Sequence, residues 1–126
     1  MYASDFNGEI VIDTESQVVE FIRNRPAFNA NQIIFTFNES GIPQLCAFIR
    51  DDYCVLYFLD SEQTGTFASC GDDNIRDETI TFYENVHGAE VVLASTMVIT
   101  VKQMTDACTE FFKTKIRPKC IKWMEL

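Results

Sequence analysis

Apolar side chains recur at helical spacing in two stretches of the chain, each behind the same type of capping sequence. Thr14 and Thr100 are each followed three residues later by a glutamine, and this spacing forms a capping box that starts a helix. Behind the second box, an apolar stripe at helical spacing consists of Met104, Ala107, Cys108, Phe111 and Phe112. Pro26 and Pro118 limit the two helices, because proline cannot continue a helix and disfavours helix at the preceding residue. The pattern predicts a short helix that ends near Asn24 and a longer one that ends before Pro118.

The rest of the chain consists of short β-type runs separated by turn residues. The run 53–59 is apolar at every position, which is typical of a central strand covered on both faces. We expect a hairpin between this run and the run 44–50, with Asp51-Asp52 as its connection, although a tight turn of this kind usually contains glycine. Further short strands are predicted at 8–13, 32–37, 66–70, 79–84, 89–94 and 120–123.

These elements sum to about seven or eight strands, mostly consecutive, and two helices. Consecutive strands favour an antiparallel sheet, so the predicted fold class is α+β and not a series of βαβ units. The chain has 126 residues, which is enough for one domain with a substantial core and too few for two ordinary ones. We see no internal repeat and no linker, and therefore predict a single domain over residues 1–126.

The five cysteines are an odd number and show no CxxC spacing, which argues against a disulfide framework and against a zinc ribbon. Free cysteine is among the most buried residue types, so buried thiols are the simpler interpretation. In the expected hairpin, Cys46 faces Tyr57 and Cys54 faces Ile49, so the two sulfurs are not cross-strand partners.

Charge is unevenly distributed along the chain, whose net charge is -9. Residues 1–101 carry 16 acidic and 4 basic side chains, whereas residues 102–126 carry 3 acidic and 6 basic ones. Such a negative field repels nucleic acid and anionic membranes and favours a basic protein partner. Acidic residues also make a protein soluble, so charge alone leaves plain solubility as an alternative.

Catalytic and metal-binding signatures are missing from the sequence. His87 is the single histidine and falls in an expected turn, and there is no GxSxG, P-loop or GxGxxG motif. Asp72-Asp73 and Asp77-Glu78 lack the ligand spacing of an EF-hand, so a solvated acidic loop is favoured over a cation site. We therefore predict a protein that is not an enzyme and uses no cofactor or metal, while a carboxylate-based enzyme stays open as an alternative.

Two features of the sequence bear on the localisation of the protein. No apolar run approaches the roughly 18 residues of a membrane helix. The N-terminus shows neither a basic cluster nor an apolar segment of the secretory type. We expect a cytoplasmic protein that binds neither membranes nor nucleic acid.

An ordered series of residues over about 53–123 carries a family resemblance: Leu56-Tyr57-Phe58, Ser69 with Gly71, Phe82-Tyr83, Gly88 with Glu90, Val98-Ile99, Ala107 with Phe111, and Pro118 with Trp123. In this order the chain resembles the deaminase-toxin-associated immunity proteins of bacterial polymorphic toxin and contact-dependent inhibition systems. The resemblance implies an α+β fold, a cognate toxin encoded beside the protein, and inhibition by occlusion. The toxin is expected to be a basic, nucleic-acid-acting C-terminal domain, either a deaminase or a nuclease.

An acidic inhibitor can fill the positively charged groove of such a toxin by imitating phosphates with carboxylates. The loops 60–65 and 71–78 concentrate this charge, so the predicted toxin contacts are Asp60, Glu62, Asp72, Asp73, Asp77 and Glu78. Tyr57 and Tyr83 are predicted as anchors, because tyrosine tolerates a wet edge and recurs in interfaces. Trp123 is expected in the core. A general adaptor domain with an unknown partner is the alternative function.

Overall fold

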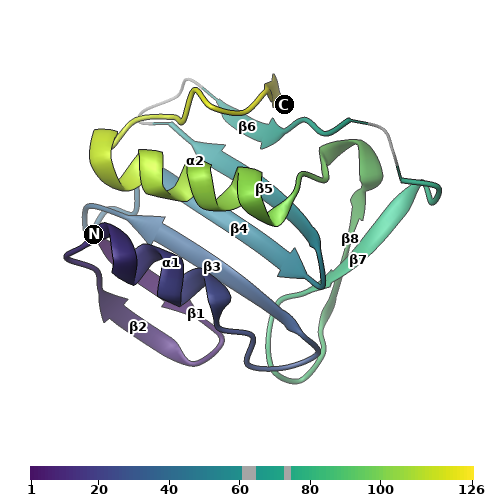
Figure 1. Cartoon of the computed structure of the whole chain (residues 1–126), viewed down its shortest axis with the longest axis horizontal. Helices are drawn as coiled ribbons and strands as arrows, with labels where there is room; N and C mark the ends of the chain where they lie inside the picture. The colour runs from purple at the N-terminus through teal and green to yellow at the C-terminus, as the bar shows by residue number, and fades with distance from the viewer. Residues whose placement is uncertain (61–64, 73–74) are drawn as a thin grey trace.

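Seven strands form one antiparallel sheet, in the order β2-β1-β3-β4-β5-β6-β9, in the computed structural model of the chain (Figure 1). The structure describes residues 1–60, 65–72 and 75–126. The strands of this sheet are β1 (Tyr2–Asp5), β2 (Gly8–Val11), β3 (Ala30–Thr36), β4 (Gln44–Arg50), β5 (Tyr53–Leu59), β6 (Thr66–Ser69) and β9 (Trp123–Glu125). A separate two-stranded hairpin consists of β7 (Thr79–Tyr83) and β8 (Glu90–Ala94). The α+β class predicted from the sequence is confirmed.

Two helices cover one face of the large sheet (Figure 1). They are α1 (Glu15–Arg23) and α2 (Val101–Thr114), and a short 3-10 helix, η1 (Ser95–Met97), precedes α2. Both capping boxes form as predicted, with Thr14 and Thr100 as the N-caps. The first helix ends before Asn24, and the second ends where Lys115 takes a left-handed conformation with φ 62°. The two helix predictions are therefore confirmed.

The main hydrophobic core lies between these helices and the sheet. Phe111 of α2 is fully buried, and its ring centroid lies 5.2 Å from that of Phe37 and 5.9 Å from that of Phe58. Trp123 packs against the same core and donates a hydrogen bond from Nε1 to the carbonyl oxygen of Pro118, at 2.7 Å. The apolar stripe seen in the sequence of α2 thus faces the sheet.

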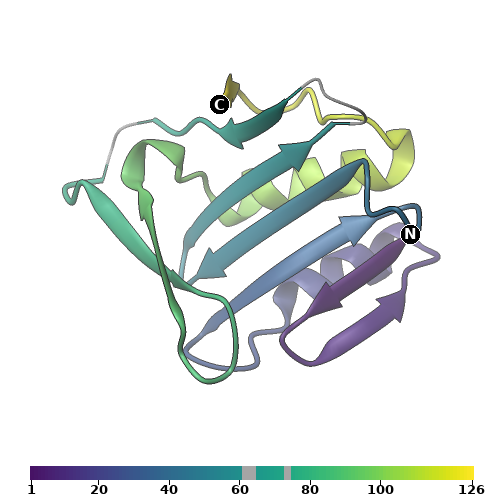
Figure 2. The same cartoon turned by 180° about the vertical axis from the view of Figure 1, so that it is seen from behind.

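A second core lies on the opposite face of the sheet, under the β7–β8 hairpin. Phe48, Val55, Ile80, Phe82 and Val98 are buried there. Figure 2 shows the hairpin against one end of this face, while β1 and β2 are left uncovered on the same side. Strand β5 is therefore covered on both faces, as its uninterrupted apolar sequence predicted.

The β4–β5 hairpin has the predicted register. Arg50 pairs with Tyr53 across a two-residue turn, and the same register places Cys46 opposite Tyr57 and Cys54 opposite Ile49. The turn contains no glycine, and Asp51 adopts the left-handed conformation itself, with φ 52°. The missing glycine therefore did not lengthen the turn.

Two details of the strand prediction were wrong. Strand β1 was not predicted, because only Ala3 of its four residues is buried and the sequence shows little apolar alternation. The last strand was expected at 120–123 but spans Trp123–Glu125. Before this strand, the carbonyl oxygen of Lys122 accepts a hydrogen bond from the amide of Cys70, but regular pairing with β6 begins only at Trp123.

Ser69 joins three segments through one buried hydroxyl group. Its Oγ accepts a hydrogen bond from the amide of Leu56 at 3.0 Å and donates one to the carbonyl oxygen of Met97 at 2.6 Å. Ser69→Ala is expected to lower the free energy of unfolding by about 2 kcal/mol, since it leaves buried backbone groups without partners. Urea unfolding measures this loss. Ser40→Ala, at an exposed position, should unfold like the wild type, and equal midpoints for both variants would contradict the expectation.

Candidate functional site

Antiparallel pairing brings the β4–β5 turn and the loop between β6 and β7 to the same end of the sheet. Asp52 and Asp72 line one hollow of about 190 Å³ beside the start of α2. Ser95 lines the same hollow, and its amide donates a hydrogen bond to the carbonyl oxygen of Glu78 at 2.9 Å. We call this surface the acidic end, and its exposed carboxylates belong to Asp51, Asp52, Asp72, Asp77 and Glu78.

Positive charge near the acidic end neutralises only part of it. The Arg50 side chain donates a hydrogen bond from Nε to the carbonyl oxygen of Thr81 at 2.7 Å and forms a 3.2 Å ion pair with Asp51. Arg76 is exposed in the β6–β7 loop. Arg25 also reaches this surface, where its Nη1 donates to the carbonyl oxygen of Asp51. The five carboxylates outnumber these three arginines, so the surface has a net negative charge.

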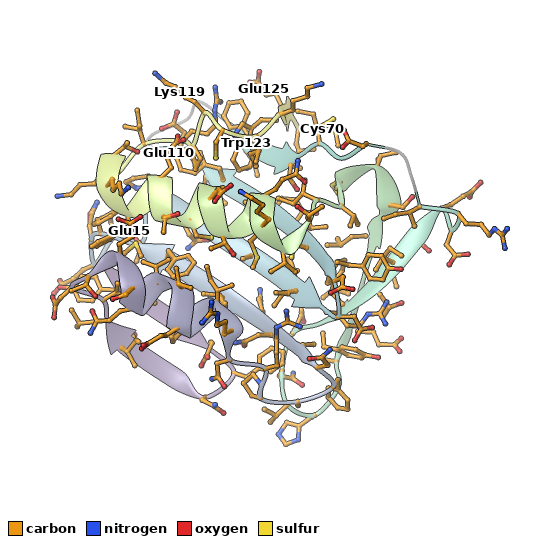
Figure 3. The ribbon with its side chains drawn as sticks, in the orientation of Figure 1. Glu15, Cys70, Glu110, Lys119, Trp123 and Glu125 are labelled. Atoms are coloured by element: carbon orange, nitrogen blue, oxygen red, sulfur yellow. The ribbon has the colours of Figure 1, made fainter. Side chains whose placement is uncertain are left out.

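The structure separates Asp60 from the acidic end. Asp60 follows the last residue of β5, at the opposite end of that strand from Asp52, and lines a different hollow together with Arg117 and Lys119. In Figure 3, Lys119 lies toward one end of this edge of the molecule, and Cys70, which leads into the loop with Asp72, lies toward the other. Asp60 therefore lies in a mixed-charge environment, apart from the predicted contacts Asp72, Asp77 and Glu78.

Two of the predicted contact residues cannot be placed. Glu62 and Asp73 lie outside the described residues. The structure thus brings together Asp72, Asp77 and Glu78 from the predicted set, and adds Asp51 and Asp52, which the sequence analysis treated only as turn residues. Their position follows from the antiparallel order, because the residues before β5 and after β6 must lie at the same end of the sheet.

The two predicted tyrosine anchors lie in different environments. Tyr57 is half-buried on the face opposite the helices, edge-on to Phe48, and its hydroxyl group donates to Met97 Sδ at 3.8 Å. Burial raises the pKa of Tyr57 above its ordinary value. Tyr83 lies at the far end of β7, where its ring centroid is 4.8 Å from that of Phe28. The exposed aromatic partner Phe28 was not identified from the sequence. It lies in a turn, where no periodic pattern of apolar residues surrounds it.

The described part of the chain contains no group of three His, Cys, Asp or Glu side chains placed to hold a metal ion. His87 is exposed in the β7–β8 turn, where its amide donates to Oδ1 of Asn85. Burial raises the pKa of the Cys46 thiol to about 11 and that of the Cys54 thiol to about 12, which keeps both protonated near neutral pH. The acidic end therefore presents charged and hydrogen-bonding groups that suit it to binding.

Among the described helices, neither is long and apolar enough to cross a membrane.

The chain is 45% identical, over 126 residues and the full length of both proteins, to the "Double-stranded DNA deaminase immunity protein" of Burkholderia cenocepacia (strain H111). No family model matches the chain. This relative places the chain in the class of immunity proteins, and the α+β fold agrees with the expectation for that class. At this identity over its whole length, the chain belongs to the family of double-stranded DNA deaminase immunity proteins. The family resemblance found in the sequence is confirmed.

Proposed function

We propose that this protein binds the deaminase domain of a cognate toxin and covers the surface through which that domain would bind DNA. The full-length relationship to a protein named as a double-stranded DNA deaminase immunity protein carries this proposal. It favours a deaminase over a nuclease as the partner. The protein would act by occupying its target and not by catalysis, in the cytoplasm of a bacterium that encodes a polymorphic toxin or contact-dependent inhibition system.

The acidic end supplies the complementary charge that such binding needs. A domain that acts on double-stranded DNA must attract phosphates with basic residues. Carboxylates of Asp72, Asp77 and Glu78, together with Asp52 across the shared hollow, can occupy the positions of those phosphates. Complementary charge of this kind mainly increases the association rate and excludes the wrong partners.

The test uses the deaminase domain of the toxin encoded beside this protein. Deamination of a duplex DNA substrate is measured at increasing ratios of protein to toxin, and binding kinetics are measured at low and high salt. We expect inhibition to be complete near one equivalent and association to slow as salt screens the charges. A toxin that stays active at a large molar excess of the protein would disprove the proposal.

A further inference from the structure

Phe28 is an exposed aromatic residue in an unusual backbone turn. Phe28 and Asn29 are the two central residues of the turn between α1 and β3, with φ values of 59° and 51°. The amide of Ala30 closes the turn by donating to the carbonyl oxygen of Ala27 at 2.8 Å. Bulky residues rarely adopt positive φ, and turns of this geometry prefer asparagine or glycine. The Phe28 side chain is nevertheless 51% exposed, so burial in a core does not explain its presence.

Hydrogen bonds clamp this turn to the acidic end. Arg25 Nη1 donates to the carbonyl oxygens of Asn29 and Asp51, at 3.0 and 3.1 Å. Asn29 Nδ2 donates to Oδ1 of Asp51 at 3.0 Å, and the amide of Asp51 donates to the carbonyl oxygen of Asn29 at the same distance. A strained conformation persists where its surroundings hold it in place, and such positions are frequent in ligand-binding sites.

The Phe28 ring is part of a larger exposed patch. It lies against the Tyr83 ring, at an interplanar angle of 32°, and faces Gly88, where an added Cβ would come within 3.2 Å of Phe28 Cζ. Val86, in the same turn as Gly88, is 42% exposed. We call Phe28 and Tyr83 the aromatic patch, and the exposed side chains of Glu84 and Glu90 flank Tyr83 in sequence and in strand pairing.

We infer that the aromatic patch anchors the toxin interface, an inference that rests on the proposed function. An apolar centre of aromatic residues with a polar rim is the composition of an interface hot spot. The acidic rim and the adjoining acidic end match a basic partner, so the occupant is the basic deaminase domain itself. Phe28 inserts into an apolar pocket beside the DNA-binding groove, while the acidic end covers the groove.

The two surfaces then have separable kinetic roles. Charges steer the encounter and determine the association rate, whereas a buried aromatic anchor determines how long the complex lasts. The lifetime of the complex should therefore depend on Phe28 at any salt concentration. The association rate should depend on the acidic end mainly at low salt.

Phe28→Asn tests the anchor, because asparagine tolerates the positive φ and keeps the turn. We expect the complex with the deaminase domain to dissociate at least tenfold faster at both low and high salt. The association rate and the melting temperature should stay close to those of the wild type. Ile116→Asn is the matched control, since Ile116 is 54% exposed but lies after α2, in the hollow with Asp60, and should change neither rate.

The possible results distinguish the inferred role of Phe28 from the proposed inhibitory function. If the Phe28→Asn complex dissociates at the wild-type rate, Phe28 is not an anchor, but the proposed inhibitory function is unaffected. A wild-type protein that does not bind the deaminase domain would overturn both. Faster dissociation of Phe28→Asn with an unchanged Ile116→Asn complex would support the anchor.

Discussion

Gly71→Ala is expected to destabilise the protein severely. A Cβ atom at this position would lie 1.9 Å from the carbonyl oxygen of Val98, 2.9 Å from its carbonyl carbon and 3.3 Å from the carbonyl oxygen of Thr96. All three atoms belong to the backbone, so no side-chain rotation can relieve the overlap. The position requires glycine because another chain segment passes against it, and not because of its φ angle.

The opposing backbone has little freedom to move away. The amide of Gly71 itself donates to the carbonyl oxygen of Thr96 at 2.7 Å, and Met97 is held by the buried hydroxyl group of Ser69. Ile99, the next residue after Val98, forms a β-bridge with Cys54. Displacement of this segment would break several of these bonds, so we expect a loss of about 3–5 kcal/mol in the free energy of unfolding.

Urea unfolding of the variant beside Gly8→Ala measures this effect. Gly8 has a positive φ, but a Cβ atom there meets nothing within 4 Å. Gly8→Ala should therefore lose only the smaller amount due to backbone strain, about 1–2 kcal/mol. If Gly71→Ala unfolds at the same urea concentration as Gly8→Ala, the close approach to Val98 does not explain why position 71 requires glycine.

Charge reversal at the acidic end is expected to have the largest effect on toxin binding. Replacing Asp72, Asp77 and Glu78 with lysine together changes the net charge from -9 to -3. If the toxin has the basic groove that the proposed function requires, the new cations would repel it. We then expect affinity for the deaminase domain to fall on the order of 100-fold at low salt, mostly through slower association. Stopped-flow association at several salt concentrations measures the change.

A second triple variant separates local charge from net charge. Glu9 in β2, Asp13 before α1 and Glu20 within α1 are exposed away from the acidic end, and their replacement with lysine gives the same net charge of -3. This control should retain most of the wild-type association rate. Equal losses in the two triple variants would show that total charge, and not the acidic end, controls association.

Local sequence signals predicted the parts of the fold that depend on near neighbours. Capping boxes at Thr14 and Thr100 fixed the helix starts, and Pro26 and Pro118 limited their ends. The β4–β5 register followed from hairpin geometry alone. Strand β9 was misplaced because its start depends on pairing with β6, a neighbour that is distant in sequence.

The candidate site was predicted only in part, for a related reason. Asp60 and Asp72 are close in sequence, but β6 runs between them and they line different hollows. Asp51 and Asp52 lie near the loop that contains Asp72 only because β5 and β6 are antiparallel neighbours. Phe28 was overlooked because a single aromatic residue in a turn has no periodic pattern around it.

The large sheet has short strands at both of its edges. Strand β2 has four residues and β9 has three, and each carries an exposed glutamate, Glu9 and Glu125 respectively. Sheet edges with few unpaired backbone groups and a charged side chain resist pairing with other chains. Copies of this protein are therefore protected from pairing edge to edge with one another at high concentration.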